Sequence, residues 1–173
     1  MLTLQVITVL LVAVTMALAL AHALEYPGKM RLSKENYIAT QSIYYPGFTI
    51  GGFGEALGLL ASLALMFEMP RGSAPFWWSV FGFVALAIMH TVFWTVTQPV
   101  NRHWTANIRM SPGAQQFFGV QQRQSGSGES PQPDQWKRLR DRWEYSHIIR
   151  AVFATIGLIC ITVAIVLYGR GAN

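Results

Sequence analysis

Two ionisable side chains interrupt long apolar stretches of this sequence. Glu55 is the only charged residue between positions 46 and 67, and His90 lies in the uncharged run between Arg71 and Arg102. An ionisable group within a membrane-spanning helix costs roughly 2.5 to 3.5 kcal/mol on insertion scales, so it needs a partner, a water-filled cavity or a task. We therefore take Glu55 and His90 as candidate functional residues.

A second candidate group shares one face of a predicted helix. Glu144, His147 and Arg150 are spaced by three, and this face continues into Ala151 and Ala154, small residues of the kind found where membrane helices pack. We expect the face to point into a helix bundle. A similar stripe is predicted for Gly51, Glu55, Gly58 and Ser62.

All four apolar stretches place polar groups toward one end of the molecule. His22 and Glu25 close the first stretch there. Glu55 and His90 each lie ~14 Å inside the same boundary at 1.5 Å per residue. Convergent polar groups favour a small-molecule site. The alternative is structural: Glu55 pairs with Arg150 or His90, and His22 and His147 are interfacial side chains that hydrogen-bond to loop backbone.

Metal chemistry stays open as an alternative. Glu144-x-x-His147 is similar to the Glu-x-x-His motif of di-iron carboxylate bundles, but those sites need two such motifs and two further carboxylates. Histidines can also hold a single metal ion or a haem. We expect no cofactor, and if a metal is present its candidate ligands are His22, His90, His147 and Glu55.

Composition predicts the fold class. Only 12% of the 173 residues are charged. Apolar stretches cover about 2–23, 46–68, 76–99 and 145–168, each near the ~20 residues that cross ~30 Å of hydrocarbon. We predict an all-α integral membrane four-helix bundle forming a single domain. The first stretch could instead be a secretory signal ending at Ala21-His22-Ala23, but it is long for one and no basic segment precedes it.

Two further segments have their own character. Between Asp134 and His147, aromatic and apolar residues recur at helical spacing with basic residues between them, which predicts an interfacial helix before the fourth span. Residues of about 111–135 are rich in Gln, Ser, Gly and Pro, which predicts a flexible cytoplasmic linker. The lone cysteine, Cys160, excludes an intrachain disulfide and a thiolate-zinc site.

The net charge of +5 follows from basic residues in the two long connections. Only Arg71 and Arg170 flank the opposite side, so both termini should lie outside and both long loops in the cytoplasm, in the inner or plasma membrane. We expect contact with anionic lipid and a hydrophobic small molecule rather than nucleic acid, and a homo-oligomer or larger membrane complex stays open. The basic residues are Lys29, Arg31, Lys34, Arg102, Arg109, Arg123, Lys137, Arg138, Arg140 and Arg142.

Several short motifs resemble a known family. Tyr45-Pro46-Gly47 precedes a glycine-rich second span, Gln98-Pro99-Val100-Asn101 closes the third, and residues 136–150 read WKRLRDRWEYSHIIR. Together with a first span ending in His22, these resemble a small four-span membrane family of largely unknown function that includes the anthrone oxygenases of fungal polyketide pathways. The likeness covers most of the chain apart from the linker.

The resemblance implies oxidation of a phenolic or anthrone-like carbon by molecular oxygen without a dedicated organic cofactor. If that chemistry is shared, a base must remove a proton from the substrate, and His147 or His90 suits the task near neutral pH. Arg150 and Asn101 would stabilise the enolate oxygen. We expect Glu55 to act with them, and the substrate pocket at the cytoplasmic end to be lined by Asn101, Trp143, Glu144 and His22.

The same residues fit two other functions unequally well. A non-enzymatic subunit of a larger complex would use the same polar cluster for assembly or lipid-headgroup binding. A transporter or proton path through Glu55 is disfavoured because the chain shows no inverted repeat and no pair of broken helices. An enzyme predicts that Glu55, His90, His147 and Arg150 converge on a cavity, whereas a subunit predicts that they satisfy one another.

Overall fold

The computed structural model describes residues 1–44, 46–104 and 133–171, and these residues are helical with short turns and no strand. Within these described ranges, four helices are long and apolar enough to cross a membrane, so the chain is a multi-pass membrane protein, as predicted. The elements are α1 Leu2–Lys29, α2 Lys34–Thr40, the 3-10 helix η1 Gln41–Tyr44, α3 Gly47–Glu68, α4 Ala74–Val92, the π-helix η2 Phe93–Thr97, α5 Gln98–Trp104 and α7 Pro133–Gly171.

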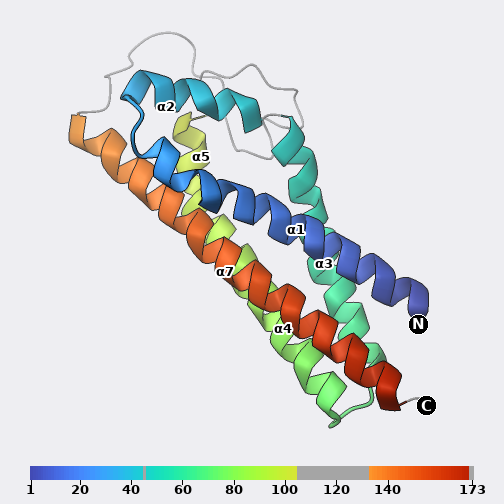
Figure 1. Cartoon of the computed structure of the whole chain (residues 1–173). Coiled ribbons are helices and arrows are strands. Elements are labelled where there is room, and N and C mark those ends of the chain that lie inside the picture. The colour runs from blue at the N-terminus through green and yellow to red at the C-terminus, as the bar shows by residue number, and fades with distance from the viewer. Residues whose placement is uncertain (45, 105–132, 172–173) are drawn as a thin grey trace.

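The four long helices form a bundle in which α1 and α4 each pack against both α3 and α7. Figure 1 shows both chain termini at one end of this bundle and α2 lying across the other end. We call the second end the α2 end. Since α1 and α4 separate α3 from α7, a contact between α3 and α7 must cross the interior of the bundle.

Local chemistry sets several helix boundaries. The side chains of Ser33 and Ser73 each accept a hydrogen bond from a backbone N–H three residues on, and so cap α2 and α4. The turn between α3 and α4 contains Gly72 with φ of 78°, a left-handed conformation that costs glycine little. This tight turn makes α3 and α4 antiparallel neighbours.

The helix predicted before the fourth span is present, and it runs into that span without a break. α7 has 39 residues, so at 1.5 Å per residue it is ~58 Å long, well beyond the ~30 Å of a hydrocarbon core. Its first turns carry Trp136 and Trp143, which are buried with Tyr37 of α2 and Val100 of α5. The two tryptophans therefore hold the α2 end together. Positions 111–132 of the predicted linker lie outside the described residues.

Close helix packing uses small residues. A Cβ at Gly51 of α3 would collide with the Leu18 side chain of α1, and a Cβ at Gly58 would contact Leu11 of α1, so the predicted stripe on α3 faces inward. Gly82 of α4 and Gly157 of α7 also face each other, because a Cβ on either would approach the other's carbonyl oxygen within 3.5 Å. Such contacts let membrane helix backbones approach closely.

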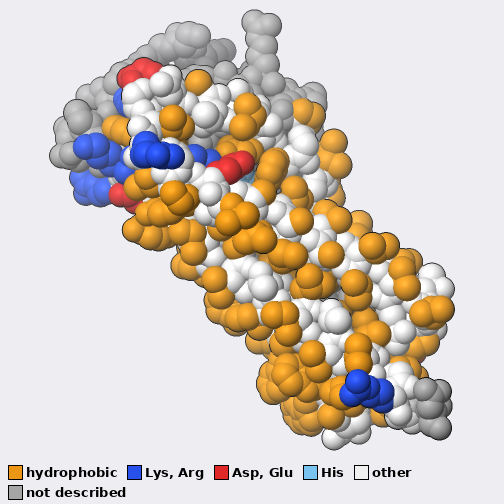
Figure 2. Space-filling model, viewed as in Figure 1, with side chains coloured by type: hydrophobic (Ala, Val, Ile, Leu, Met, Phe, Trp, Pro, Cys, Tyr) orange, Lys and Arg blue, Asp and Glu red, His pale blue; other side chains and the backbone are white. Residues whose placement is uncertain are grey.

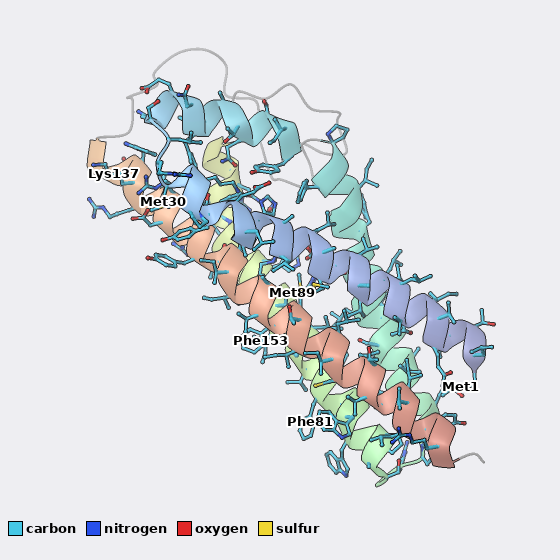
Figure 3. All side chains as sticks on the ribbon, in the orientation of Figure 1. Met1, Met30, Phe81, Met89, Lys137 and Phe153 are labelled. Atoms are coloured by element: carbon cyan, nitrogen blue, oxygen red, sulfur yellow. The ribbon has the colours of Figure 1, made fainter. Side chains whose placement is uncertain are left out.

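Apolar and charged side chains separate along the bundle. Figure 2 shows hydrophobic side chains covering its length and most of the visible Lys and Arg side chains at the α2 end. Inside, Met89, labelled in Figure 3, is buried with Ala19, Ala151 and Ala154. Ala19 and Ala154 lie about one turn from His22 and Arg150, so this apolar cluster closes the polar site on the side of the termini.

Candidate functional site

Two buried histidines meet where α1 and α7 pack at the α2 end. The ring centroids of His22 and His147 are 4.1 Å apart. A cation lies at each Nδ1: Lys29 Nζ is 3.4 Å from His22, and Arg150 Nη1 is 3.2 Å from His147. Because lysine and arginine only donate, both Nδ1 atoms accept, and the imidazole proton of each ring lies on Nε2.

Aromatic rings enclose the histidine pair. The rings of Tyr44 and Phe48 are each 4.5 Å from the His22 ring. Trp143 lies 5.2 Å from His22 and 4.2 Å from His147, in an edge-on arrangement with both. The pair therefore sits in a dry environment, in which hydrogen bonds and charges act more strongly than in water.

An ion pair crosses the interior of the bundle. Arg150 Nη2 of α7 donates to Glu55 Oε1 of α3, and both side chains are almost fully buried. The guanidinium carbon of Arg150 is also 5.0 Å from the centre of the Phe93 ring. Glu55 thus neutralises the cation that holds His147, as the structural alternative for Glu55 predicted.

Lys29 lies between two carboxylates. Its Nζ is 2.8 Å from Glu25 Oε2 and 3.8 Å from Glu144 Oε1. The same Nζ is 4.8 Å from the ring centres of Tyr44 and Trp143. Buried charges of this kind are tolerated because they are paired and stacked against aromatic faces.

Two tyrosines attach α2 and η1 to the site. Tyr37 donates to Glu144 Oε1 at 2.9 Å, and Tyr44 donates to Glu25 Oε2 at 2.5 Å. Burial raises the pKa of both phenols above the ordinary value, and the neighbouring carboxylates raise it further. Both tyrosines therefore remain protonated donors at neutral pH.

Three polar atoms of this cluster lack a partner within the part of the chain that the structure describes: Glu144 Oε2, His147 Nε2 and the Arg150 Nε. Buried polar atoms are nearly always hydrogen-bonded, so each exception calls for an explanation such as a water, an ion or a catalytic role. Here a carboxylate oxygen that can accept and two N–H groups that can donate belong to one buried cluster. The arrangement suits a ligand with an oxygen-bearing polar group.

The structure brings together most of the residues that the sequence singled out. His22, Glu55, Trp143, Glu144, His147 and Arg150 are joined by the contacts above. His90 lies on α4, and its Nε2 accepts from Nε1 of Trp94, which lies in the following segment η2, at 2.9 Å. Among the described contacts, His90 reaches the cluster only through Phe93, whose ring lies 6.5 Å from its own.

Asn101 has a supporting place in the structure. Its Oδ1 accepts from Trp143 Nε1 at 2.7 Å, and its Nδ2 donates to Gln98 at 3.2 Å. Asn101 therefore orients the tryptophan that packs edge-on against both histidines. The sequence predicted Asn101 as a substrate contact, and this stays a prediction.

A π-helical segment shapes the side of the site formed by α4. Within η2, the Thr97 hydroxyl lies 2.9 Å from that of Ser146, and the Thr95 carbonyl accepts from Arg142 at 3.3 Å. Phe93 begins the same segment and stacks on Arg150. Short π-helical segments are frequent at functional sites. No periodicity in the sequence predicted this one.

Sequence reasoning missed Lys29, Tyr37 and Tyr44. Lys29 was counted only with the basic residues of the long connections. Its spacing could have predicted its place in the site, because His22, Glu25 and Lys29 are three and four residues apart and so share one helix face. The two tyrosines gave no such signal, since their partners lie 107 and 19 residues away.

The described residues contain no group of three or more His, Cys, Asp and Glu side chains placed to hold a metal ion. The metal ligands predicted from the sequence, His22, His90, His147 and Glu55, stay a prediction.

Comparison with known proteins gives one family. A family model described as anthrone oxygenase matches residues 41–160, more than two thirds of the chain. The match includes Glu55, Trp143, Glu144, His147 and Arg150, while His22 and Lys29 lie before it. Comparisons with curated proteins and with solved structures gave no match.

Proposed function

Since the chain belongs to the anthrone oxygenase family, we propose that it is a membrane oxygenase acting on a hydrophobic phenolic or anthrone-like substrate. The observation that carries the proposal is the pair of unpartnered atoms, Glu144 Oε2 and His147 Nε2, in one buried aromatic cluster. One can accept a proton and the other can donate a hydrogen bond to an oxygen.

The reaction balances with dioxygen as the oxidant. A base removes a proton from the CH2 group of an anthrone, the carbanion adds dioxygen, and the resulting hydroperoxide loses water. One oxygen atom becomes the new carbonyl of the quinone, and the other leaves as water with both hydrogens of the CH2 group. The scheme draws on no organic cofactor, and metal and haem analysis of the purified protein tests that part of the proposal.

Glu144 is the residue that we propose as the base. Its Oε2 is buried and unpartnered, while its Oε1 is held by Tyr37. The sequence favoured His147 or His90, but the Nδ1 of His147 already accepts from Arg150, which leaves its Nε2 as a donor. We therefore propose that His147 donates to the oxygen on which negative charge develops.

Arg150 and Glu55 act on that donor indirectly. By donating to His147 Nδ1, Arg150 fixes the tautomer that carries a proton on Nε2. Glu55 and Phe93 hold the guanidinium in place. Within this proposal both residues position the histidine, and the aromatic rings of Trp143 and Phe48 supply apolar surface for a ring system.

We also propose that the α2 end faces the cytoplasm and that both termini lie outside. Support comes from the exposed basic residues at the α2 end, because cytoplasmic loops carry an excess of Lys and Arg. A hydrophobic substrate would then reach the site from the lipid. The exposed basic side chains are Arg31, Arg102, Lys137, Arg138 and Arg142.

The alternative of a non-enzymatic subunit has its own support. The ion pair of Glu55 with Arg150 and the tyrosine bonds to Glu25 and Glu144 show that much of the cluster satisfies itself. Polar groups kept only for assembly would leave no reason for unpartnered atoms at the centre. The three unpartnered atoms therefore favour the enzyme.

The proposal is tested with the full chain in lipid nanodiscs, using anthrone as the substrate. Oxygen consumption and anthraquinone formation should exceed those of empty nanodiscs and should occur in equal amounts. Anthrone also reacts slowly with oxygen by itself, so the rate in empty nanodiscs is subtracted. A rate equal to that background across a series of phenolic and anthrone substrates would favour the subunit.

A further inference from the structure

Glu144 can act as a base only while it is ionised, so this buried carboxylate has to exchange protons with solvent. Glu144 has no exposed side-chain surface, and the apolar cluster around Met89 closes the site toward the termini. In the balanced reaction both hydrogens of the CH2 group end in water, so this exchange sets the ionisation of Glu144 in the resting protein. The route of exchange has to lead toward the α2 end.

Lys29 and Glu25 form a short path in that direction. Lys29 Nζ lies 3.8 Å from the buried Glu144 and 2.8 Å from Glu25, whose side chain is 40% exposed. Exposure thus rises from 0% at Glu144 through 6% at Lys29 to 40% at Glu25. Each step joins groups that can exchange a proton after a small movement of the lysine side chain.

We propose that Lys29 and Glu25 carry protons from Glu144 to solvent. This inference rests on the proposed function, in which Glu144 takes the proton. Lys29 first gives a proton to Glu25, which releases it to water, and the neutral amine then takes the proton from Glu144. At the end Glu144 and Glu25 are ionised and Lys29 is again an ammonium, so one proton has moved to solvent and no electron has moved.

Each helix that packs around Glu144, Lys29 and Glu25 adds a charged or titratable group. Tyr37 of α2 bonds to Glu144, and Tyr44 of η1 bonds to Glu25. Arg140 of α7 interacts electrostatically with Glu144, and His22 of α1 bonds to Lys29. Both phenols keep their protons, because burial and the carboxylates raise their pKa. Tyr37 therefore holds Glu144 in place and leaves the transfer to the lysine.

Replacing Lys29 by arginine distinguishes a purely structural role of this side chain from proton transfer. Arginine keeps the positive charge and the pairing with both carboxylates, but it does not lose its proton in proteins. Lys29→Arg should therefore behave like wild type if Lys29 only neutralises charge. If Lys29 carries protons, Lys29→Arg should fail as Lys29→Met does.

The deciding measurement needs no substrate. After a rapid pH step, time-resolved infrared spectroscopy follows the carboxyl band of Glu144, identified by its loss in Glu144→Gln. We expect the band to equilibrate at least about tenfold more slowly in both Lys29→Arg and Lys29→Met. The exposed Lys137→Arg, whose position Figure 3 labels, should match wild type. Thermal melting of every variant checks that it is folded.

The outcomes separate a failure of the proton path from a failure of the proposed function. Equal rates in wild type and Lys29→Arg, or a Glu144 band that responds to no pH step, would overturn the proton path. If the infrared rates depend on Lys29 but no substrate supports oxygen consumption, the path stands and the proposed oxygenase function fails. If oxygen consumption is present but the infrared rates do not depend on Lys29, the function stands and the path fails.

Discussion

The imidazole rings of His22 and His147 lie 4.1 Å apart, and each is held at Nδ1 by a different cation. This relationship joins the first and last helices of the bundle. It also fixes which nitrogen of each ring can act on a ligand, because a nitrogen that accepts from lysine or arginine carries no proton.

The tautomers of the two histidines can be measured directly. Nitrogen NMR of the protein labelled at histidine should show both His22 and His147 with the proton on Nε2. Lys29→Met should change the signals of His22 more than those of His147, since Lys29 bonds only to the former. A proton on Nδ1 of His147 in the wild type would contradict the role proposed for its Nε2.

Removing one partner of the buried ion pair should destabilise the bundle. Glu55→Gln leaves the buried Arg150 without its countercharge, which typically costs about 3 to 5 kcal/mol. Unfolding in mixed micelles measures the loss. Glu68→Gln changes an exposed residue at the end of the same helix and should have little effect. Equal stabilities of these two variants would show that the pair contributes nothing.

Tyr37 gives a prediction that depends on pH. Its pKa is higher in the folded protein than in the unfolded chain, so its stabilising effect is complete below about pH 10 and is lost as pH rises further. Tyr37→Phe should cost about 1.5 to 3 kcal/mol at pH 8, because a buried bond to a carboxylate disappears. The difference from wild type should shrink above pH 10.

Thermal melting at pH 8 and at pH 10.5 tests this. Tyr168→Phe, a partly buried tyrosine near the other end of the bundle, serves as the control. A cost for Tyr37→Phe that stays constant or grows above pH 10 would contradict the account of the α2 end.

Glycine packing between α4 and α7 gives a further test. A methyl group at Gly82 would lie 2.9 Å from the Ile161 side chain and 3.3 Å from the Gly157 carbonyl oxygen. Gly82→Ala should therefore destabilise the protein by about 1 to 3 kcal/mol. Gly54→Ala is the matched control, because nothing lies within 4 Å of the added methyl group. A neutral Gly82→Ala would mean that the two helices separate at little cost.

The sequence predicted the fold well and the site only in part. Four long apolar stretches left little choice but a helical membrane bundle, and the spacing of Glu144, His147 and Arg150 placed them on one inward face. Pairing between distant segments was harder to foresee. No residue near Tyr37 in the sequence indicates that it bonds to Glu144. The polar connection that contains Tyr37 has the composition of a solvent-exposed segment.

Roles were less predictable than positions. His147 was a natural candidate base by residue type, but the Nδ1 contact with Arg150 depends on the side-chain arrangement that α7 adopts against α3. For His90 the depth in the membrane was predictable, because it matches that of Glu55 in the sequence. The side of α4 on which His90 lies depends on helix packing and on the π-helical segment η2, and sequence periodicity does not reveal either.

The central claim is that Glu144 removes the substrate proton, and the kinetics of Glu144→Gln test it most directly. Glutamine keeps the size and can still accept from Tyr37, but it cannot take a proton. We expect anthrone-dependent oxygen consumption in nanodiscs to fall by about 10²-fold or more, while Lys137→Met retains the wild-type rate. A Glu144→Gln protein that is folded and consumes oxygen at the wild-type rate would contradict the claim.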